Sequence, residues 1–324
     1  MQRDDGWITG LYLDGTGGAE KSNGALLPAD LAAGRPVWVQ LNMNEWASQL
    51  WLREESRLSE VVVEALLADE TRPRCLAVDD GVLLNLRGVN LNPGADPADM
   101  VAIRMWAEEK QVVSVQRRRL RAVNDVEKHL ADGLGPKDVA EFLADLSDSL
   151  AERMSHVIGD INHRIDELEE TILDENEQEL RANLRALRRE IIGLRRYIAP
   201  QREAMTRLAA EDFGWMRPLE RQQIREAADL LTRYIEDIDM ARERAAVVQD
   251  ELNSNLSERM NKNTYVLSIV AGIFLPLTLI TGLLGINVAG IPYAEWPGAF
   301  ATVAVLLVVI GAAGLFWLRK LHWF

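Results

Sequence analysis

A row of positions near the C-terminal end of the chain could line a path for an ion. Steps of three and four residues from Asn261 follow one face of a helix, and this face is small or carries hydroxyl groups, whereas the other faces are bulky and apolar, Leu279 among them. Hydroxyl and amide oxygens can contact the water around an ion, so the face could border an aqueous pore. Small residues equally favour close packing of membrane helices. The row comprises Asn261, Thr264, Ser268, Ala271, Leu275, Thr278, Gly282 and Gly285.

Two apolar segments, residues 265–284 and 296–318, would have to position this face. Each is about 20 residues long, and a helix of that length crosses the hydrocarbon layer of a bilayer, about 30 Å thick. The loop between them begins Gly285-Ile286-Asn287 and is too short for a domain. We therefore expect an antiparallel hairpin of two membrane spans, with the Gly-Ile-Asn triplet at its outer turn. Pro276 lies within the first span, where neighbouring helices or water can satisfy the carbonyl that it frees.

The charges beside the spans predict their orientation. Arg259 and Lys262 precede the first span and Arg319 and Lys320 follow the second, whereas the loop between them has no Lys or Arg and one acid, Glu295. Positive charge stays on the cytoplasmic side, so both termini should lie in the cytoplasm.

The remaining composition narrows the classes of partner. The net charge of −14 argues against nucleic acid as a partner, because nucleic acid requires a clustered basic surface. The acidity could enrich cations at the protein surface or serve solubility alone. A single cysteine, Cys75, excludes a disulfide framework and a cysteine-rich metal cluster within one chain.

The first 135 residues predict an α/β domain, because short β-rich runs alternate with helical ones. No glycine-rich phosphate motif follows a predicted strand and no pair of nucleophile and histidine is evident, so we do not expect an enzyme. Asp79-Asp80-Gly81 is a good hairpin turn. The runs predict strands at 7–13 and 37–41, a helix at 59–68, and hairpins formed by 75–78 with 82–86 and by 100–106 with 111–116.

After Pro136 the pattern becomes that of long helices. Residues 139–173 and 179–198 predict a helical hairpin that is broken near 174–176 and ends before Pro200. The first helix becomes acidic towards its end and the second is rich in arginine, so mutual salt bridges are the favoured interpretation, with a cation-attracting acidic surface as the alternative.

A single helix should then run from Leu219 to Gly285, because neither Pro nor Gly interrupts residues 219–271. It would be roughly 100 Å long and would need partners to bury its apolar stripe. The stripe consists of Ile224, Ala228, Leu231, Ile235, Ile238, Ala241, Ala245, Val248, Leu252 and Leu256. The chain thus divides into the α/β domain (1–135), the helical hairpin (136–218), the stalk (219–263), a first span (264–285), an outer loop (286–295), a second span (296–318) and a basic tail (319–324).

Two spans enclose no pore, so conduction would need an oligomer around the first span, in which each stripe residue forms a ring. Leu275 would then be a hydrophobic constriction and Asn287 a ring of amide oxygens suited to a hydrated cation. Neither span contains an acid, histidine or cysteine, so a dehydrated transition metal would find no ligand set there. His129, His156 and His163 are scattered, and a structural role for them is favoured over cytoplasmic metal ligation.

The run IFLPLTLITGLLGIN, followed by a short loop, a second span and the terminus LRKLHWF, resembles the CorA superfamily of divalent-cation transporters, whose hallmark is a GxN triplet. The form Gly285-Ile286-Asn287 is similar to that of the ZntB zinc transporters within the superfamily, whereas the CorA magnesium channels carry GMN. The resemblance covers the whole architecture. It implies a homopentameric funnel in a bacterial inner membrane, with Gly285, Ile286 and Asn287 as the outer filter.

The resemblance also implies that Asn261, Thr264, Leu267, Leu275 and Thr278 lie along the pore. It implies Zn²⁺ as the transported ion, coupled to a proton gradient, although no residue of the spans titrates. Glu295 would attract cations at the outer mouth. The oxygen ligands by themselves favour a hydrated ion such as Mg²⁺, so Mg²⁺ and Co²⁺, and with them Ni²⁺ and Cd²⁺, remain alternatives. No cofactor is expected. A membrane-anchored helical scaffold that conducts nothing would also explain the stalk, but it would not explain the polar stripe.

Overall fold

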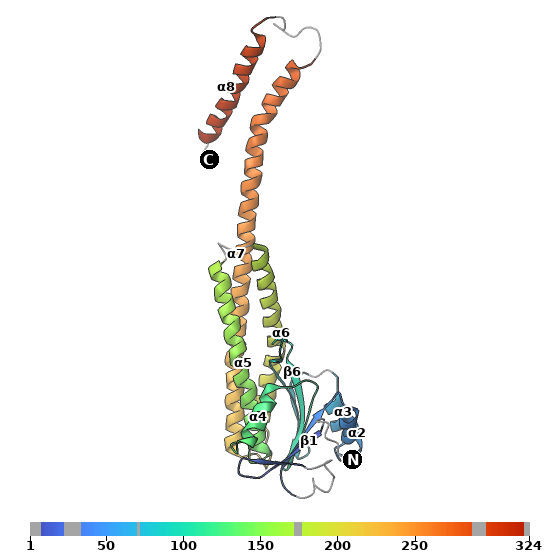
Figure 1. Cartoon of the computed structure of the whole chain (residues 1–324). Coiled ribbons are helices and arrows are strands. Elements are labelled where there is room, and N and C mark those ends of the chain that lie inside the picture. Colours follow the sequence, from blue (N-terminus) through green and yellow to red (C-terminus); the bar gives the residue numbers. More distant parts are fainter. Residues whose placement is uncertain (1–7, 23–33, 70–71, 172–176, 287–295, 321–324) are drawn as a thin grey trace. The chain divides into compact units, whose positions relative to one another are not determined.

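The computed structural model describes residues 8–22, 34–69, 72–171, 177–286 and 296–320 (Figure 1). The chain forms two compact units, Met1–Gln249 and Asp250–Phe324.

The first unit begins with a seven-stranded mixed sheet in the order β2-β1-β3-β7-β6-β5-β4. Strands β3 and β7 run parallel, with Val39 opposite Val113, and every other neighbouring pair is antiparallel. The hairpins predicted around Asp79-Asp80-Gly81 and at 100–116 are confirmed, as is the α/β class. The strands are β1 (Ile8–Leu13), β2 (Ala19–Lys21), β3 (Val37–Asn42), β4 (Arg74–Val78), β5 (Gly81–Gly88), β6 (Val101–Glu108) and β7 (Gln111–Gln116).

Helices cover both faces of this sheet (Figure 1). On one face, α2 (Trp46–Glu54) and α3 (Glu60–Leu67) contribute Trp51, Leu52 and other apolar side chains to a core shared with β3 and β7. On the other face lie α4 (Arg121–Ala131) and α5 (Val139–Glu170), where the ring of Phe142 packs 4.6 Å from that of Trp38. Helix α3 matches its predicted range within one residue at each end, whereas α2 and α4 were not predicted.

Helices α5, α6 (Glu177–Ala210) and the first part of α7 (Pro218–Leu284) run side by side in the first unit (Figure 1). The prediction that α6 ends before Pro200 is wrong, because the helix continues to Ala210. Pro200 removes one backbone donor, but the carbonyl left free belongs to Arg196, an exposed residue at which water can take the donor's place. Buried Ile198, Gln201 and Ala204 on either side of Pro200 hold the helix in place by packing.

The salt bridges between these helices also differ from the prediction. Asp166 and Glu169 of α5 pair with Arg244 of α7, and Arg195 of α6 pairs with Asp239 of α7. The α5–α6 bridge seen among the described residues has the reverse polarity, from Arg164 of α5 to Glu190 of α6. It has an N–O distance of 2.6 Å. Among the described residues, the acidic end of α5 and Arg195 of α6 therefore pair with α7 rather than with each other.

Helix α7 is continuous, as predicted, and its apolar stripe is buried in the first unit from Ile224 to Val248, apart from the half-buried Ile235. In the second unit α7 is followed by α8 (Ala299–Lys320). Within the part of the chain that the structure describes, α7 is long and apolar enough to cross a membrane, and α8 contains the shorter apolar stretch Ala299–Gly314.

Candidate functional site

The polar row of α7 is brought together on one exposed helix face in the second unit. The helix is unbroken through residue 284, so steps of three and four residues keep the row in line. Every member from Asn261 to Gly282 is exposed, and so is Leu267, which lies beside the row. A large apolar residue stands within the row and another beside it: Leu275 is 69% and Leu267 68% exposed. A face with this much bare surface must meet a protein partner, lipid or water.

Helix α8 packs on the opposite side of α7. Two glycines of α8 permit the approach: a Cβ on Gly311 would lie 3.8 Å from Leu277, and one on Gly314 would lie 4.0 Å from Ile273. Around the axis of α7, Ile273 and Leu277 each lie about 160° from Leu275, on either side. Among residues 256–284 of α7, the buried Ile269 and the half-buried Ile273, Leu277 and Ile280 lie on this side, about 120° to 160° from Leu275. Half-buried Tyr265 lies about 80° from Leu275. The second helix of the hairpin therefore leaves the polar row bare.

The hydroxyl groups of the row present acceptors to the space in front of them. Ser268 Oγ donates to the carbonyl of Thr264 at 2.9 Å, and Thr278 Oγ1 donates to that of Phe274 at 2.8 Å. Each of these hydroxyls has a single proton, and that proton is donated to a backbone carbonyl. Only oxygen lone pairs therefore face outward. Lone pairs attract cations or the hydrogens of water and offer nothing to an anion.

An apolar hollow lies at the C-terminal end of the row. It is lined by Leu275, Thr278, Leu279, Gly282, Leu283 and Ile286. Leu279, predicted to lie on one of the bulky faces away from the row, borders the same hollow as Leu275. The spacing of four residues between these two leucines was the signal that could have placed it correctly.

The triplet predicted to form the outer filter is described in part. Helix α7 ends where the backbone N–H of Gly285 donates to the carbonyl of Thr281 at 2.9 Å, and Ile286 follows with 47% exposure. Asn287 and Glu295 lie outside the described residues, so their roles stay predictions.

No group of three or more histidine, cysteine or acidic side chains converges at metal-binding distance within the described ranges. His129 pairs instead with Asp145 at 3.2 Å and His163 with Glu167 at 3.3 Å. Burial raises the pKa of the Cys75 thiol to about 12, so this cysteine is not a thiolate ligand at neutral pH.

The acidic side chains of the first unit instead form a diffuse negative surface. One recess is lined by Glu141, Asp145, Asp148, Glu220 and Glu226. Partial burial, and then the neighbouring charges of Glu152, Asp145 and Glu226, raise the pKa of Asp148. Arg217 partly neutralises this region through ion pairs with Glu141 at 2.9 Å and Glu220 at 2.6 Å. Such a surface attracts cations without ligating them.

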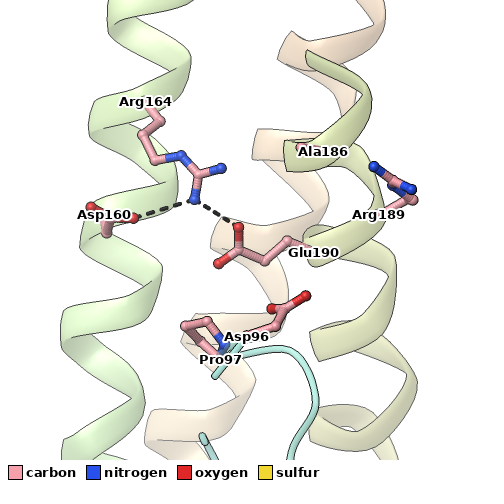
Figure 2. Close-up of a pocket in the computed structure, with 7 residues that line it drawn as sticks. All are labelled: Asp96, Pro97, Asp160, Arg164, Ala186, Arg189 and Glu190. Carbon is pink, nitrogen blue, oxygen red and sulfur yellow. Dashed lines mark hydrogen bonds and ion pairs between the residues drawn. The ribbon is translucent and has the colours of Figure 1, made fainter. Parts of the chain in front are cut away.

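A second recess, between α5 and α6, is neutralised more completely. Figure 2 shows Arg164 between Asp160 and Glu190, and the distances from its Nη1 to their carboxylate oxygens are 3.4 and 2.6 Å. Arg189 points away from this pair in the same view. The recess therefore has the character of a structural ion-pair site.

The chain matches the family described as CorA-like Mg²⁺ transporter protein over residues 33–320. The chain belongs to the CorA-like Mg²⁺ transporter family. It is 37% identical over 321 residues to the divalent cation transporter CmaX of Pseudomonas aeruginosa, which covers 98% of this chain and 97% of that protein. It is 36% identical over 317 residues to the zinc transport protein ZntB of Yersinia enterocolitica, covering 98% and 95%. The structure of full-length CmaX matches with a TM-score of 0.82 over 98% of both chains.

Membership confirms the predicted resemblance and the fold, with its α/β domain, helical stalk and apolar C-terminal helices. It makes this CorA-family protein a membrane transporter of divalent cations rather than an enzyme or an inert scaffold.

Proposed function

We propose that this protein moves Zn²⁺, as a hydrated ion, through a homopentameric pore lined by α7. The observation that carries the proposal is the bare row of acceptor oxygens on the face of α7 opposite α8. Zinc is favoured over other divalent ions by the likeness to the zinc transport protein ZntB and by the triplet Gly285-Ile286-Asn287.

A pentamer would give each part of this face a role. Five copies of α7 around one axis turn Thr264, Ser268 and Thr278 into rings of oxygen atoms, and Leu275 into a hydrophobic constriction that gates by dewetting. Gly285, Ile286 and Asn287 would form the outer filter, and Glu295 would attract cations to it. Helix α8 would form the outer ring in contact with lipid, which suits exposed side chains such as Phe300 and Val308.

The setting we propose is a bacterial inner membrane, with both termini in the cytoplasm. The positive charges beside the spans support this orientation. A proton gradient would drive zinc movement. The groups that could bind its protons lie outside the described spans, because neither apolar segment contains an acid or a histidine.

A matched pair of threonines tests the pore face. Thr278 lies about 60° from Leu275 around the helix axis and Thr281 about 120° away, on the border of the side facing α8. Both hydroxyls donate to backbone carbonyls, so valine removes the same intrahelical bond at either position. In proteoliposomes loaded with a zinc-sensitive dye, we expect Thr278→Val to slow zinc uptake about tenfold, the effect of one hydrogen bond to the water shell of the ion. Thr281→Val should transport normally.

Two further measurements complete the test. Asn287→Ala should abolish most of the zinc uptake, and the mass of the protein in detergent should be that of a pentamer. A monomer or dimer, or equal uptake by the Thr278→Val and Thr281→Val variants, would contradict the proposed pore.

The alternative is a Mg²⁺ or Co²⁺ channel, and the oxygen-only lining favours it, because these ligands suit hard, hydrated ions. Rapid Mg²⁺ flux together with undetectable Zn²⁺ flux in the same vesicles would establish that alternative and leave the pore geometry unchanged.

A further inference from the structure

We propose that the backbone carbonyl of Gly272 forms an additional ring of oxygen ligands for the hydrated ion, at the level of the Leu275 constriction. The inference rests on the proposed pore and adds to it a group that side-chain chemistry does not reveal.

The carbonyl is free because of Pro276. In an α-helix the carbonyl of one residue accepts from the N–H four residues later, and proline has no N–H. Helix α7 runs through Pro276 without a break, so the oxygen of Gly272 faces a missing donor within continuous helix. The hydroxyl protons of the nearest turns are engaged elsewhere: Ser268 donates to Thr264, and Thr278 donates to Phe274.

The surroundings of Gly272 leave this oxygen accessible. Glycine has no side chain to cover its carbonyl, and a Cβ at this position would meet nothing within 4 Å. Gly272 lies about 60° from Leu275 around the helix axis, whereas Ile273 and Leu277, which α8 approaches, each lie about 160° from Leu275. The free carbonyl is therefore on the side of α7 that α8 leaves bare.

A free carbonyl in the hydrocarbon layer cannot stay without a partner. Desolvating one there is costly, so it must meet water, an ion or another donor. Carbonyl oxygens of a helix point towards its C-terminus, which places this oxygen beside Leu275. A ring of such oxygens would hold water next to an apolar constriction and offer the cation a strong dipole without a fixed charge. The ion could then pass Leu275 with its water shell intact.

The decisive experiment varies the backbone at position 276 and leaves the side chain small. Pro276→Ala supplies the missing N–H and should occupy the Gly272 carbonyl. Replacing Pro276 by lactic acid, the α-hydroxy analogue of alanine, through nonsense suppression gives the same side chain with an ester oxygen and no N–H. Both proteins are reconstituted as full-length chains, their mass in detergent is measured, and initial rates of Zn²⁺ uptake are compared with the wild type.

We expect Pro276→Ala to lower the uptake rate about tenfold and the lactic acid variant to restore it to within about twofold of wild type. Equal rates for Pro276→Ala and wild type would overturn the inference. Low rates in both variants would also overturn it, since they would assign the effect to the proline ring. If Pro276→Ala does not assemble, Pro276→Gly, which also carries the N–H, replaces it. Absence of zinc uptake by the assembled wild type would refute the proposed function itself, a different outcome from all of these.

Discussion

The ion pair between Arg164 and Glu190 should be a major stabilising contact of the helical part of the first unit. The carboxylate of Glu190 is 10% exposed, and its Oε2 accepts from Arg164 at 2.6 Å. Arg164→Met keeps most of the aliphatic length and removes the charge, which leaves a buried carboxylate without its cation. Breaking a buried pair in this way costs about 3 to 5 kcal/mol. Because Arg164 is itself 34% exposed and water can partly replace it, we take the lower limit, about 3 kcal/mol.

Thermal unfolding of the full-length protein in detergent can measure this loss. For a unit of this size, 3 kcal/mol corresponds to a fall in Tm of about 6 to 12 °C. Arg189→Met is the matched control, because Arg189 lines the same recess, is exposed, and points away from Glu190 (Figure 2). It should change Tm by less than about 2 °C, since isolated surface charges contribute little. Similar shifts for Arg164→Met and Arg189→Met would refute the reasoning.

Two other perturbations test the packing and the charge of the first unit. Gly81→Ala should destabilise the protein by about 1 to 3 kcal/mol, because its Cβ would overlap Cζ2 of the buried Trp106. At Gly159 a Cβ would meet nothing within 4 Å, so Gly159→Ala should leave the stability unchanged or raise it by up to about 1 kcal/mol. Asp148→Asn should raise Tm at pH 7.5. The pKa of Asp148 is raised in the folded state, so its ionisation destabilises the folded protein as pH rises through the folded pKa. The gain in Tm from Asp148→Asn should therefore vanish below the ordinary pKa of 3.8. A Tm difference between Asp148→Asn and wild type that does not change with pH would contradict the charge argument. Equal effects of Gly81→Ala and Gly159→Ala on stability would contradict the packing argument.

Local periodicity was sufficient to predict most elements and the face of α7, because helix geometry fixes which residues share a face. The turn at Asp79-Asp80-Gly81 was also predictable from local sequence, because aspartate and glycine favour turn conformations. Asp79 adopts a φ of 50° there. The parallel pairing of β3 with β7 was not predictable, since it joins segments far apart in the chain through a long crossover.

Where the sequence analysis was wrong, tertiary contacts outweighed local preference. Pro200 is a strong local signal for the end of a helix, yet the packing of Gln201, Ala204 and Met205 on the following turn continues α6. The charge pattern of α5 and α6 correctly predicted ion pairs but not their partners, because Arg244 and Asp239 belong to a third helix. The bare side of α7 needed the structure as well, since only the positions of Gly311 and Gly314 show which face α8 covers.

The lining of α7 bears directly on how a pore of this kind could select its ion. Thiolate and imidazole ligands, which distinguish zinc from magnesium by direct coordination, are missing from both apolar segments of the sequence. The hydroxyls of Ser268 and Thr278 donate their protons to backbone carbonyls, so in the proposed pore their lone pairs would contact the water shell of the ion rather than the metal. Zinc and magnesium carry the same charge, and acceptors of this kind recognise charge and the size of the hydrated ion. In the proposed pore, selection between the two ions would therefore depend on how readily each water shell deforms at the narrowest rings. Leu275, the Gly272 carbonyl and the triplet Gly285-Ile286-Asn287 would then determine the specificity.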